Sequence, residues 1–356
     1  MRYGASTLLV DRTCTIRTPV AFWNVYSHYS LIPLGLFFRT GYWKHVKQYK
    51  EPYQTTAHIA AGAAGNDGVD MTGKVVVVTG ANSGLGKAVA TYAASKGAKL
   101  FMMCRSADRA AAAKQEISDL TGNTDIQVVL CNVAEMKNIR TAVKELQSKT
   151  DKIDCLVCNA GALLNDKQES SEGYELTFAS HLLGGAYLLP KLLLPQLQAA
   201  GGNGRCVFVT SGGMYNFKFP SWEVATSQKG TYNGVNVYAY AKRGQVLLAE
   251  RFAVEYPDVA WVTVHPGWTD TPAVEEAFGD KKKYLAPLRE PWQGAEGMAW
   301  LTQTSKENLT NGAFYLDRIP QTKHLGGPFF SEGSFTKNKP KEVDEMMANL
   351  KKAAGV

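Results

Sequence analysis

Short apolar runs alternate with amphipathic stretches along most of the chain after residue 73. The apolar runs predict strands near 74–79, 99–104, 126–131, 153–158, 205–210, 260–265 and 312–316, with helices between them, such as 106–120, 135–150 and 238–256. The first run contains four consecutive valines, which is typical of a strand buried on both faces. Parallel strands need crossover helices, so the alternation predicts an α/β fold with a doubly wound parallel sheet of about seven strands.

The length of 356 residues suits one large α/β domain with extensions. We expect an N-terminal extension over residues 1–71, the α/β domain over 72–330 and a C-terminal helical tail over 331–356. Residues 60–70 are rich in Ala and Gly, which predicts a flexible linker. Residues 1–30 carry three arginines and one acid among many Ser and Thr. This composition resembles a mitochondrial transit peptide, although short polar leaders look similar, so the mitochondrion is one expected location.

Residues 31–53 are aromatic and basic, and their apolar run is too short to span a bilayer. On a helix, Phe38, Tyr42, Val46 and Tyr49 form one stripe beside several Lys and Arg. Two interpretations stay open. The stripe contacts an anionic membrane surface, or it packs on the chain's own domain or on a partner subunit.

The net charge of +7 is mild for this length, which argues against a nucleic-acid-binding protein and suits an anionic cofactor or an acidic membrane surface. Six cysteines lack the spacing of a disulfide framework, so we expect a reducing compartment. Cys155 and Cys158 lie in one strand-like run and face opposite sides, so they cannot easily share a metal or a disulfide. Since no His, Cys or carboxylate cluster has ligand spacing, no metal is expected.

The stretch TGANSGLG follows the valine run and precedes a helical pattern. Gly80 allows a tight turn, Gly84 lets backbone N–H groups approach a pyrophosphate, and Gly86 lets the helix pack close to the sheet. We therefore predict a nucleotide-phosphate site. Arg105 follows the second strand, where an acid would bind the ribose of NAD. A guanidinium pairs with a 2′-phosphate instead, which favours NADP(H) unless Arg105 is a solvated cation.

Two later strand ends, those of the fourth and sixth strands, add to the predicted site. The small residues at 159–161 let a cofactor ring lie close to the backbone. A sharp turn at 266–267 follows the sixth strand, and we expect Thr269 or Thr271 to bind a nicotinamide carboxamide there. His265 beside it is interpreted as a hydrogen-bonded structural histidine.

Tyr238 and Lys242 stand four residues apart on one predicted helix face. A phenol with a pKa near 10 is a poor acid or base at neutral pH unless a neighbouring ammonium stabilises its phenolate. Ser211, at the end of the fifth strand, is placed to hydrogen-bond a substrate oxygen. Tyr240 points away from the Lys242 face and is expected to pack.

With these motifs in order, residues 72–325 resemble the short-chain dehydrogenase/reductase superfamily, whose fold is a Rossmann-type sheet. The stretches SSEGYELTF, VTSGGMYN, VHPGWTDTPAV and FYLDRIPQTKHL look most like its dehydrogenase/reductase member twelve group and, more loosely, retinol-dehydrogenase-like enzymes. The resemblance implies Tyr238 as the acid/base, Lys242 as its activator and ribose ligand, and Ser211 as the substrate orienter. The cofactor-binding positions that it implies are Gly80, Asn82, Ser83, Gly84, Leu85, Gly86, Arg105, Asn132, Val133, Asn159, Ala160, Gly161, Tyr238, Lys242, Pro266, Gly267, Thr269 and Thr271.

The chain departs from the family pattern at three positions. Cys158 replaces the first Asn of the N-N-A-G motif, and Asn132 replaces an aspartate near the adenine. His181 stands in the place of the family's proton-relay asparagine, and the sequence leaves open whether it serves or breaks that relay.

We expect an NADP(H)-dependent oxidoreductase that interconverts a lipophilic carbonyl and its alcohol. The lipophilic substrate rests on the family likeness and on the apolar segment 273–300, at the position of the family's substrate lid. The alternative is a catalytically weak, nucleotide-binding subunit of a membrane-associated assembly, suggested by the altered motifs, the basic leader and the C-terminal run VDEMMANLKKA. Homodimers are usual in the family, but Pro190 and Pro195 interrupt the helical region after the fourth strand, so the oligomeric state stays open.

Overall fold

The computed structural model describes residues 39–47, 68–326 and 335–356. Within them, eight strands form one sheet in the order β3-β2-β1-β4-β5-β6-β7-β8. The strands are β1 Val75–Thr79, β2 Lys99–Cys104, β3 Ile126–Leu130, β4 Cys155–Cys158, β5 Arg205–Val209, β6 Ala260–His265, β7 Phe314–Leu316 and β8 Ile319–Gln321. All pairings from β3 to β7 are parallel, which confirms the predicted α/β class.

The sequence did not predict β8, which pairs antiparallel with β7 across a tight turn. Asp317 and Arg318 form that turn with φ of +49° and +65°. Neither residue is a glycine or a proline, so the sequence contains no typical turn signal at this position. Asp317 is buried in this turn.

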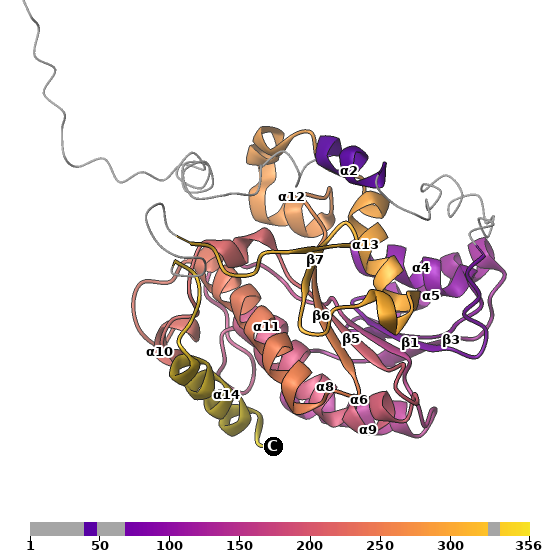
Figure 1. Cartoon of the computed structure of the whole chain (residues 1–356), viewed down its shortest axis with the longest axis horizontal. Coiled ribbons are helices and arrows are strands. Elements are labelled where there is room, and N and C mark those ends of the chain that lie inside the picture. The colour runs from indigo at the N-terminus through magenta and orange to yellow at the C-terminus, as the bar shows by residue number, and fades with distance from the viewer. Residues whose placement is uncertain (1–38, 48–67, 327–334) are drawn as a thin grey trace, which may run out of the picture.

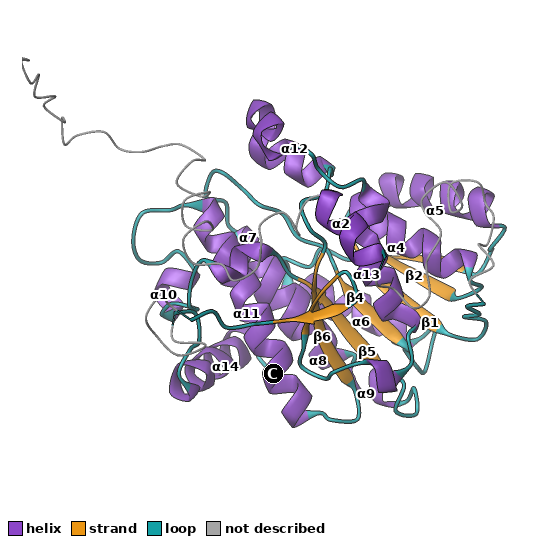
Figure 2. Ribbon diagram, turned by 45° about the horizontal axis from the view of Figure 1, so that its top comes forward, coloured by secondary structure: helices purple, strands orange, loops and turns teal. Residues whose placement is uncertain are grey.

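Helices cover both faces of the sheet (Figures 1 and 2). On one side lie α4 (Gly84–Ser95), α5 (Ala107–Thr121) and α13 (Pro291–Gln303). The opposite side holds α6 (Met136–Gln147), the π-helix η2 (Ala179–Leu188), α8 (Leu189–Leu192), α9 (Leu194–Gln198), α11 (Gly234–Glu255) and α14 (Pro340–Ala354). The shorter elements are α2 Arg39–Val46, α7 Leu176–Phe178, α10 Trp222–Ala225, α12 Pro272–Phe278 and the 3₁₀ turns η3 Gly212–Tyr215, η4 Gly279–Leu285 and η5 Lys306–Asn308.

The valine run of β1 shows why the sheet is buried on both sides. Val75 and Val77 belong to the apolar cluster under α6 and α11, whereas Val76 and Val78 belong to the cluster under α4 and α13. Each fully buried valine contributes on the order of 1.5–3 kcal/mol to stability. Since successive side chains of a strand point to opposite faces, only an uninterrupted apolar run can fill both clusters.

The C-terminal helix α14 packs on the domain rather than standing apart. Met346, Leu350 and Ala354 are buried in the cluster that also contains residues of β4 and β5. The Arg140 guanidinium donates to the carbonyl of Ala354 at 2.6 Å. The apolar stripe of the predicted tail is therefore occupied by the chain's own core.

The N-terminal helix α2 also lies on the domain, next to α12 and α13 (Figure 1). Tyr42 of the predicted stripe is 2% exposed, while Trp43 at 43% points outward. Phe38 and Tyr49, the transit-like segment 1–30 and linker residues 60–67 lie outside the described residues. In the described part of the chain, no helix has the length and apolar character needed to cross a bilayer.

Candidate active site

The glycine-rich turn after β1 has the geometry that its sequence predicts. Gly80 and Gly84 adopt φ of +66° and +54°, which disfavours any residue with a Cβ. A Cβ on Gly86 would lie 2.4 Å from the carbonyl oxygen of Gly80, so only glycine allows α4 to start this close to the strand. Ser83 caps α4 without a side-chain hydrogen bond to its first turn. A glycine-rich turn directly before a helix N-terminus is a common arrangement in anion-binding sites.

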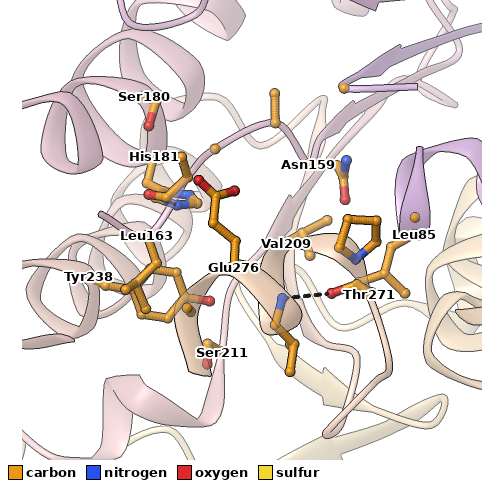
Figure 3. A pocket seen from close by; sticks show the side chains of 18 of the residues that line it. Leu85, Asn159, Leu163, Ser180, His181, Val209, Ser211, Tyr238, Thr271 and Glu276 are labelled. Atoms are coloured by element: carbon orange, nitrogen blue, oxygen red, sulfur yellow. Dashed lines mark hydrogen bonds between the residues drawn. The ribbon is translucent and has the colours of Figure 1, made fainter. Parts of the chain in front are cut away.

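A cavity of about 650 Å³ opens at the carboxyl ends of the strands (Figure 3). It brings together residues from the ends of the six strands β1 to β6 and from the loop before α12, as expected for an open parallel sheet. The sequence-predicted residues that line it are Gly80, Asn82, Ser83, Gly84, Leu85, Arg105, Asn132, Val133, Asn159, Ala160, Gly161, His181, Ser211, Tyr238, Lys242, Pro266, Gly267, Thr269 and Thr271. Gly86 is buried behind the lining and acts through packing.

Hydrogen bonds fix the end of β4 to the end of β1. The Thr79 hydroxyl oxygen accepts from the backbone N–H groups of Asn159 and Ala160, both at 2.9 Å. The Asn159 amide donates to the carbonyl of Thr79 at 3.0 Å. This network holds the small residues 159–161 rigidly against the glycine turn.

Tyr238 and Lys242 project from α11 into the cavity beside Ser211. The Lys242 amine lies 5.3 Å from the centre of the Tyr238 ring and donates to the carbonyl of Val209 at 2.6 Å. Burial lowers the pKa of Lys242 to about 7. Burial raises the pKa of Tyr238 above its ordinary value, and a hydrogen bond with Ser211 lowers it in part. The three groups that the sequence singled out are therefore neighbours.

His181 lies in the first turn of the π-helix η2, against the same cluster. Its Nε2 is 3.2 Å from the carbonyl oxygen of Ala162, which can only accept, so Nε2 carries the proton. The lone pair of Nδ1 is buried and has no hydrogen-bond partner among the described residues. Burial, together with the Lys242 charge, holds the pKa of His181 well below its ordinary value. His181 is thus a neutral acceptor within the cluster.

The loop after β6 closes the other side of the cavity. Gly267 has φ of +75°. The Thr269 hydroxyl donates to the carbonyl of Pro266 at 3.1 Å, and the Thr271 hydroxyl accepts from the N–H of Val274 at 3.3 Å, capping α12 (Figure 3). His265 accepts from the N–H of Gly267, and burial lowers its pKa to about 3, which fits a structural histidine.

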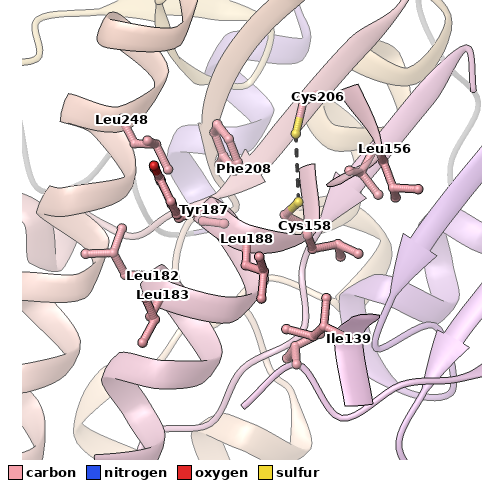
Figure 4. Packing of buried hydrophobic residues seen from close by; sticks show 14 of the residues in the cluster. Ile139, Leu156, Cys158, Leu182, Leu183, Tyr187, Leu188, Cys206, Phe208 and Leu248 are labelled. Carbon is pink, nitrogen blue, oxygen red and sulfur yellow. Dashed lines mark hydrogen bonds between the residues drawn. The ribbon is translucent and has the colours of Figure 1, made fainter. Parts of the chain in front are cut away.

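The two cysteines of the C-x-x-C sequence face opposite sides of the sheet, as predicted. Cys155 belongs to the cluster under α4, and Cys158 to the cluster under α11. The Cys158 sulfur lies 3.8 Å from that of Cys206 on β5 (Figure 4). Cys158 therefore fills core space at the motif position. In the described ranges, no group of three His, Cys, Asp or Glu side chains is arranged to hold a metal ion.

Several lining residues were not anticipated from the sequence. Ser106 and Arg109 line the cavity beside Arg105, and the four-residue spacing of the two arginines at a helix start was an available signal. The exposed carboxylate of Glu276 and the ring of Phe278, both on α12, line the cavity from the segment that was expected to form a lid. Their sequence gives no signal beyond that expectation.

Known proteins resemble this chain in sequence and in fold. Residues 74–282 match the family model described as short chain dehydrogenase. The human protein named dehydrogenase/reductase SDR family member 12 is 34% identical over 282 residues, which cover 79% of this chain and 88% of the human protein. Retinol dehydrogenase 11 of Mus musculus is 29% identical over 227 residues, 63% of this chain and 68% of the mouse protein. The crystal structure of a short-chain type dehydrogenase/reductase from Mycobacterium marinum matches with a TM-score of 0.57 and 22% identity, covering 69% of this chain and 94% of that chain.

Proposed function

The chain belongs to the short-chain dehydrogenase/reductase family, as its ordered motifs predicted, and from this premise we propose that it is an NADP(H)-dependent oxidoreductase of lipophilic carbonyls and alcohols. One observation carries the proposal: Ser211, Tyr238 and Lys242 meet in a single cavity next to the glycine cradle. A protein that only bound a nucleotide would have no need of that constellation.

The residues present fit a dinucleotide. Gly80 and Gly86 leave a cradle that a Cβ would fill, and the start of α4 offers backbone N–H groups to a pyrophosphate. Arg105 and Arg109 supply two cations at the second strand end, which suits a 2′-phosphate. Thr269 and Thr271 line the cavity from the loop after β6, where the nicotinamide would lie. When bound, the nicotinamide ring supplies or accepts the hydride.

The protein's own groups handle the proton and the orientation. Ser211 donates to the substrate oxygen and holds it next to the Tyr238 hydroxyl. Tyr238 gives the proton to that oxygen in reduction and removes it in oxidation. The nearby Lys242, when protonated, stabilises the phenolate and brings the pKa of Tyr238 toward the working pH.

The rest of the lining supports the proposed lipophilic substrate class. Apolar side chains form another part of the cavity lining, namely those of Leu163, Leu164, Leu176, Val235, Trp268, Val274 and Phe278. The resemblance to retinol dehydrogenase 11 points in the same direction. The alternative of a structural subunit loses one of its arguments, because α14 packs its apolar stripe on the chain's own core.

A peripheral contact with an acidic membrane surface stays part of the proposal. In its support, Trp43 and Lys44 of α2 and Lys47 directly after it are exposed. Cosedimentation with vesicles tests it: we expect binding to vesicles that contain phosphatidylserine, and equal binding to neutral vesicles would contradict an electrostatic contact.

The enzymatic proposal is tested with purified protein, NADPH and a panel of lipophilic aldehydes and ketones, with Tyr238→Phe as the matched variant. We expect turnover in the wild type, a loss of about 10²–10⁴-fold in the variant, and NADPH binding by both proteins. Tight NADPH binding without turnover of any carbonyl would contradict the proposal and favour the structural subunit.

A further inference from the structure

A buried ion pair lies behind the loop at residues 266–271. The Arg289 guanidinium contacts the Asp317 carboxylate at both oxygens, with distances of 2.5 Å and 2.8 Å. The arginine is 0% exposed and the aspartate 3%. Burial alone would raise the pKa of Asp317, but Arg289 and His45 hold it below its ordinary value. The buried carboxylate of Asp317 therefore depends on Arg289 and His45 to stay ionised.

Arg289 holds the loop through both its side chain and its backbone. Its N–H donates to the carbonyl of Trp268 at 2.7 Å, and its carbonyl accepts from the N–H of Asp270 at 2.8 Å. A Cβ on Gly267 would lie 2.3 Å from Nε of Arg289, so the side chain packs directly on that glycine. The position of the loop consequently depends on where Asp317 holds the guanidinium.

Helix α2 covers this ion pair and contacts both of its members. Nδ1 of His45 donates to Oδ2 of Asp317 at 2.7 Å, and His45 is itself 6% exposed. The Tyr42 ring lies over the Arg289 guanidinium, 5.5 Å from ring centre to guanidinium carbon. A buried charge is stable only while its hydrogen bonds are complete and water is excluded, so α2 supplies part of what keeps the pair intact.

We infer that Tyr42 and His45, although they belong to the N-terminal extension, are positioning residues of the cofactor site. They keep Arg289 on Asp317, and Arg289 in turn fixes the loop 266–271 at the nicotinamide end. The inference rests on the proposed function for the identity of the cofactor. The inference implies that the N-terminal extension contributes to cofactor binding by the α/β domain.

The test compares two ligands in the full chain. NADPH reaches both ends of the cavity, whereas adenosine 2′,5′-bisphosphate has no nicotinamide and engages only the Arg105 end. For Tyr42→Ala and His45→Ala we expect the Kd of NADPH to rise about five- to tenfold and that of the bisphosphate to stay unchanged. Lys44→Ala, an exposed neighbour on the same helix, is the control and should leave both constants unchanged. His45→Asn keeps an N–H donor for Asp317 and should restore NADPH affinity.

Hydrogen exchange in the ligand-free protein gives a second readout that needs no activity. We expect faster exchange at residues 266–271 in Tyr42→Ala and His45→Ala, and unchanged exchange in the glycine turn 80–86. Equal weakening of both ligands would mean general destabilisation and overturn the inference, as would unchanged affinity and exchange. A wild type that binds NADPH but reduces no carbonyl would refute only the enzymatic proposal. Should the wild type bind no NADPH, the exchange data alone decide.

Discussion

The imidazole of His181 meets the phenol ring of Tyr238 edge-on, with ring centroids 5.2 Å apart and an angle of 83° between the planes. On its other side, the imidazole fills the space beside Gly161, where a Cβ would lie 1.9 Å from the ring. The histidine is thus wedged between the backbone of β4's end and the proposed acid/base. This packing allows a residue larger than asparagine at the position, and it leaves Nδ1 as a buried acceptor.

We expect turnover to depend on Nδ1 of His181 as a hydrogen-bond acceptor and not on a charge on the ring, because burial keeps the ring neutral. His181→Leu removes the acceptor and should lower kcat by about 10²-fold, the lower end of what a positioned proton-transfer group contributes. His181→Asn keeps an acceptor oxygen and should retain most of the activity. Steady-state kinetics at pH 7 measure both, and a leucine variant with wild-type kcat would show that the relay does not pass through this residue.

Lys242 should couple NADPH binding to proton uptake. Its folded pKa is about 7, so above pH 7 the free protein holds mostly the neutral amine. The phosphates of NADPH favour the ammonium form, so binding takes up protons, and affinity should fall as pH rises above 7, by at most about tenfold per pH unit. Calorimetric titrations in buffers of different ionisation enthalpy measure the uptake. Lys242→Met is the control and should abolish it; equal slopes in both proteins would contradict this assignment.

The same residue affects stability in a defined pH window. The folded pKa of Lys242 lies below its ordinary value of 10.5, so the unfolded chain binds the additional proton between about pH 7 and 10.5. The contribution of this group to the unfolding free energy therefore increases as pH rises through that window. Denaturant titrations of the wild type and Lys242→Met at pH 7 and 9 measure it. A difference between the two proteins that grows toward pH 7 is expected, since the methionine has no charge to bury.

Arg105 and Arg109 should set the preference for NADPH over NADH. Each guanidinium can make a charge-assisted hydrogen bond to a 2′-phosphate, worth about 1.5–3 kcal/mol. Arg105→Ala and Arg109→Ala should each weaken NADPH by at least about tenfold and leave NADH nearly unchanged. Lys114→Ala, on α5 but outside the cavity, is the matched control. NADH that binds more tightly than NADPH to the wild type would refute the cofactor assignment.

Helix α14 should be needed for the stability of the domain. Leu350 is 0% exposed in the core under α11, so Leu350→Ala should lower the unfolding free energy by about 2–5 kcal/mol. Lys351→Ala, at the next and exposed position, should change it by less than about 0.5 kcal/mol. Urea unfolding followed by circular dichroism measures both. Equal midpoints for the wild type and Leu350→Ala would show that the tail is not part of the folding unit.

The fold class and the polar groups of the cavity could be predicted from the sequence because both depend on local patterns. Continuous apolar runs such as the valines of β1 can be satisfied only by a strand covered on both faces. Steric contacts within one turn require glycine at positions 80 and 86. Parallel strands place all their carboxyl ends at one edge, so chain order was enough to bring Ser211, Tyr238 and Lys242 together.

Other features depend on contacts between distant segments, and these could be seen only in the folded structure. The partner of His45 is Asp317, 272 residues away, on a turn with no glycine signal. Whether the stripe around Tyr42 faces outward or inward depends on the Arg289 charge beneath it, which no periodicity reveals. The protonation of His181 and Lys242 is likewise set by burial, a property of the packed chain. Local sequence specifies secondary structure and turns, whereas desolvation and long-range pairing exist only once the chain has packed.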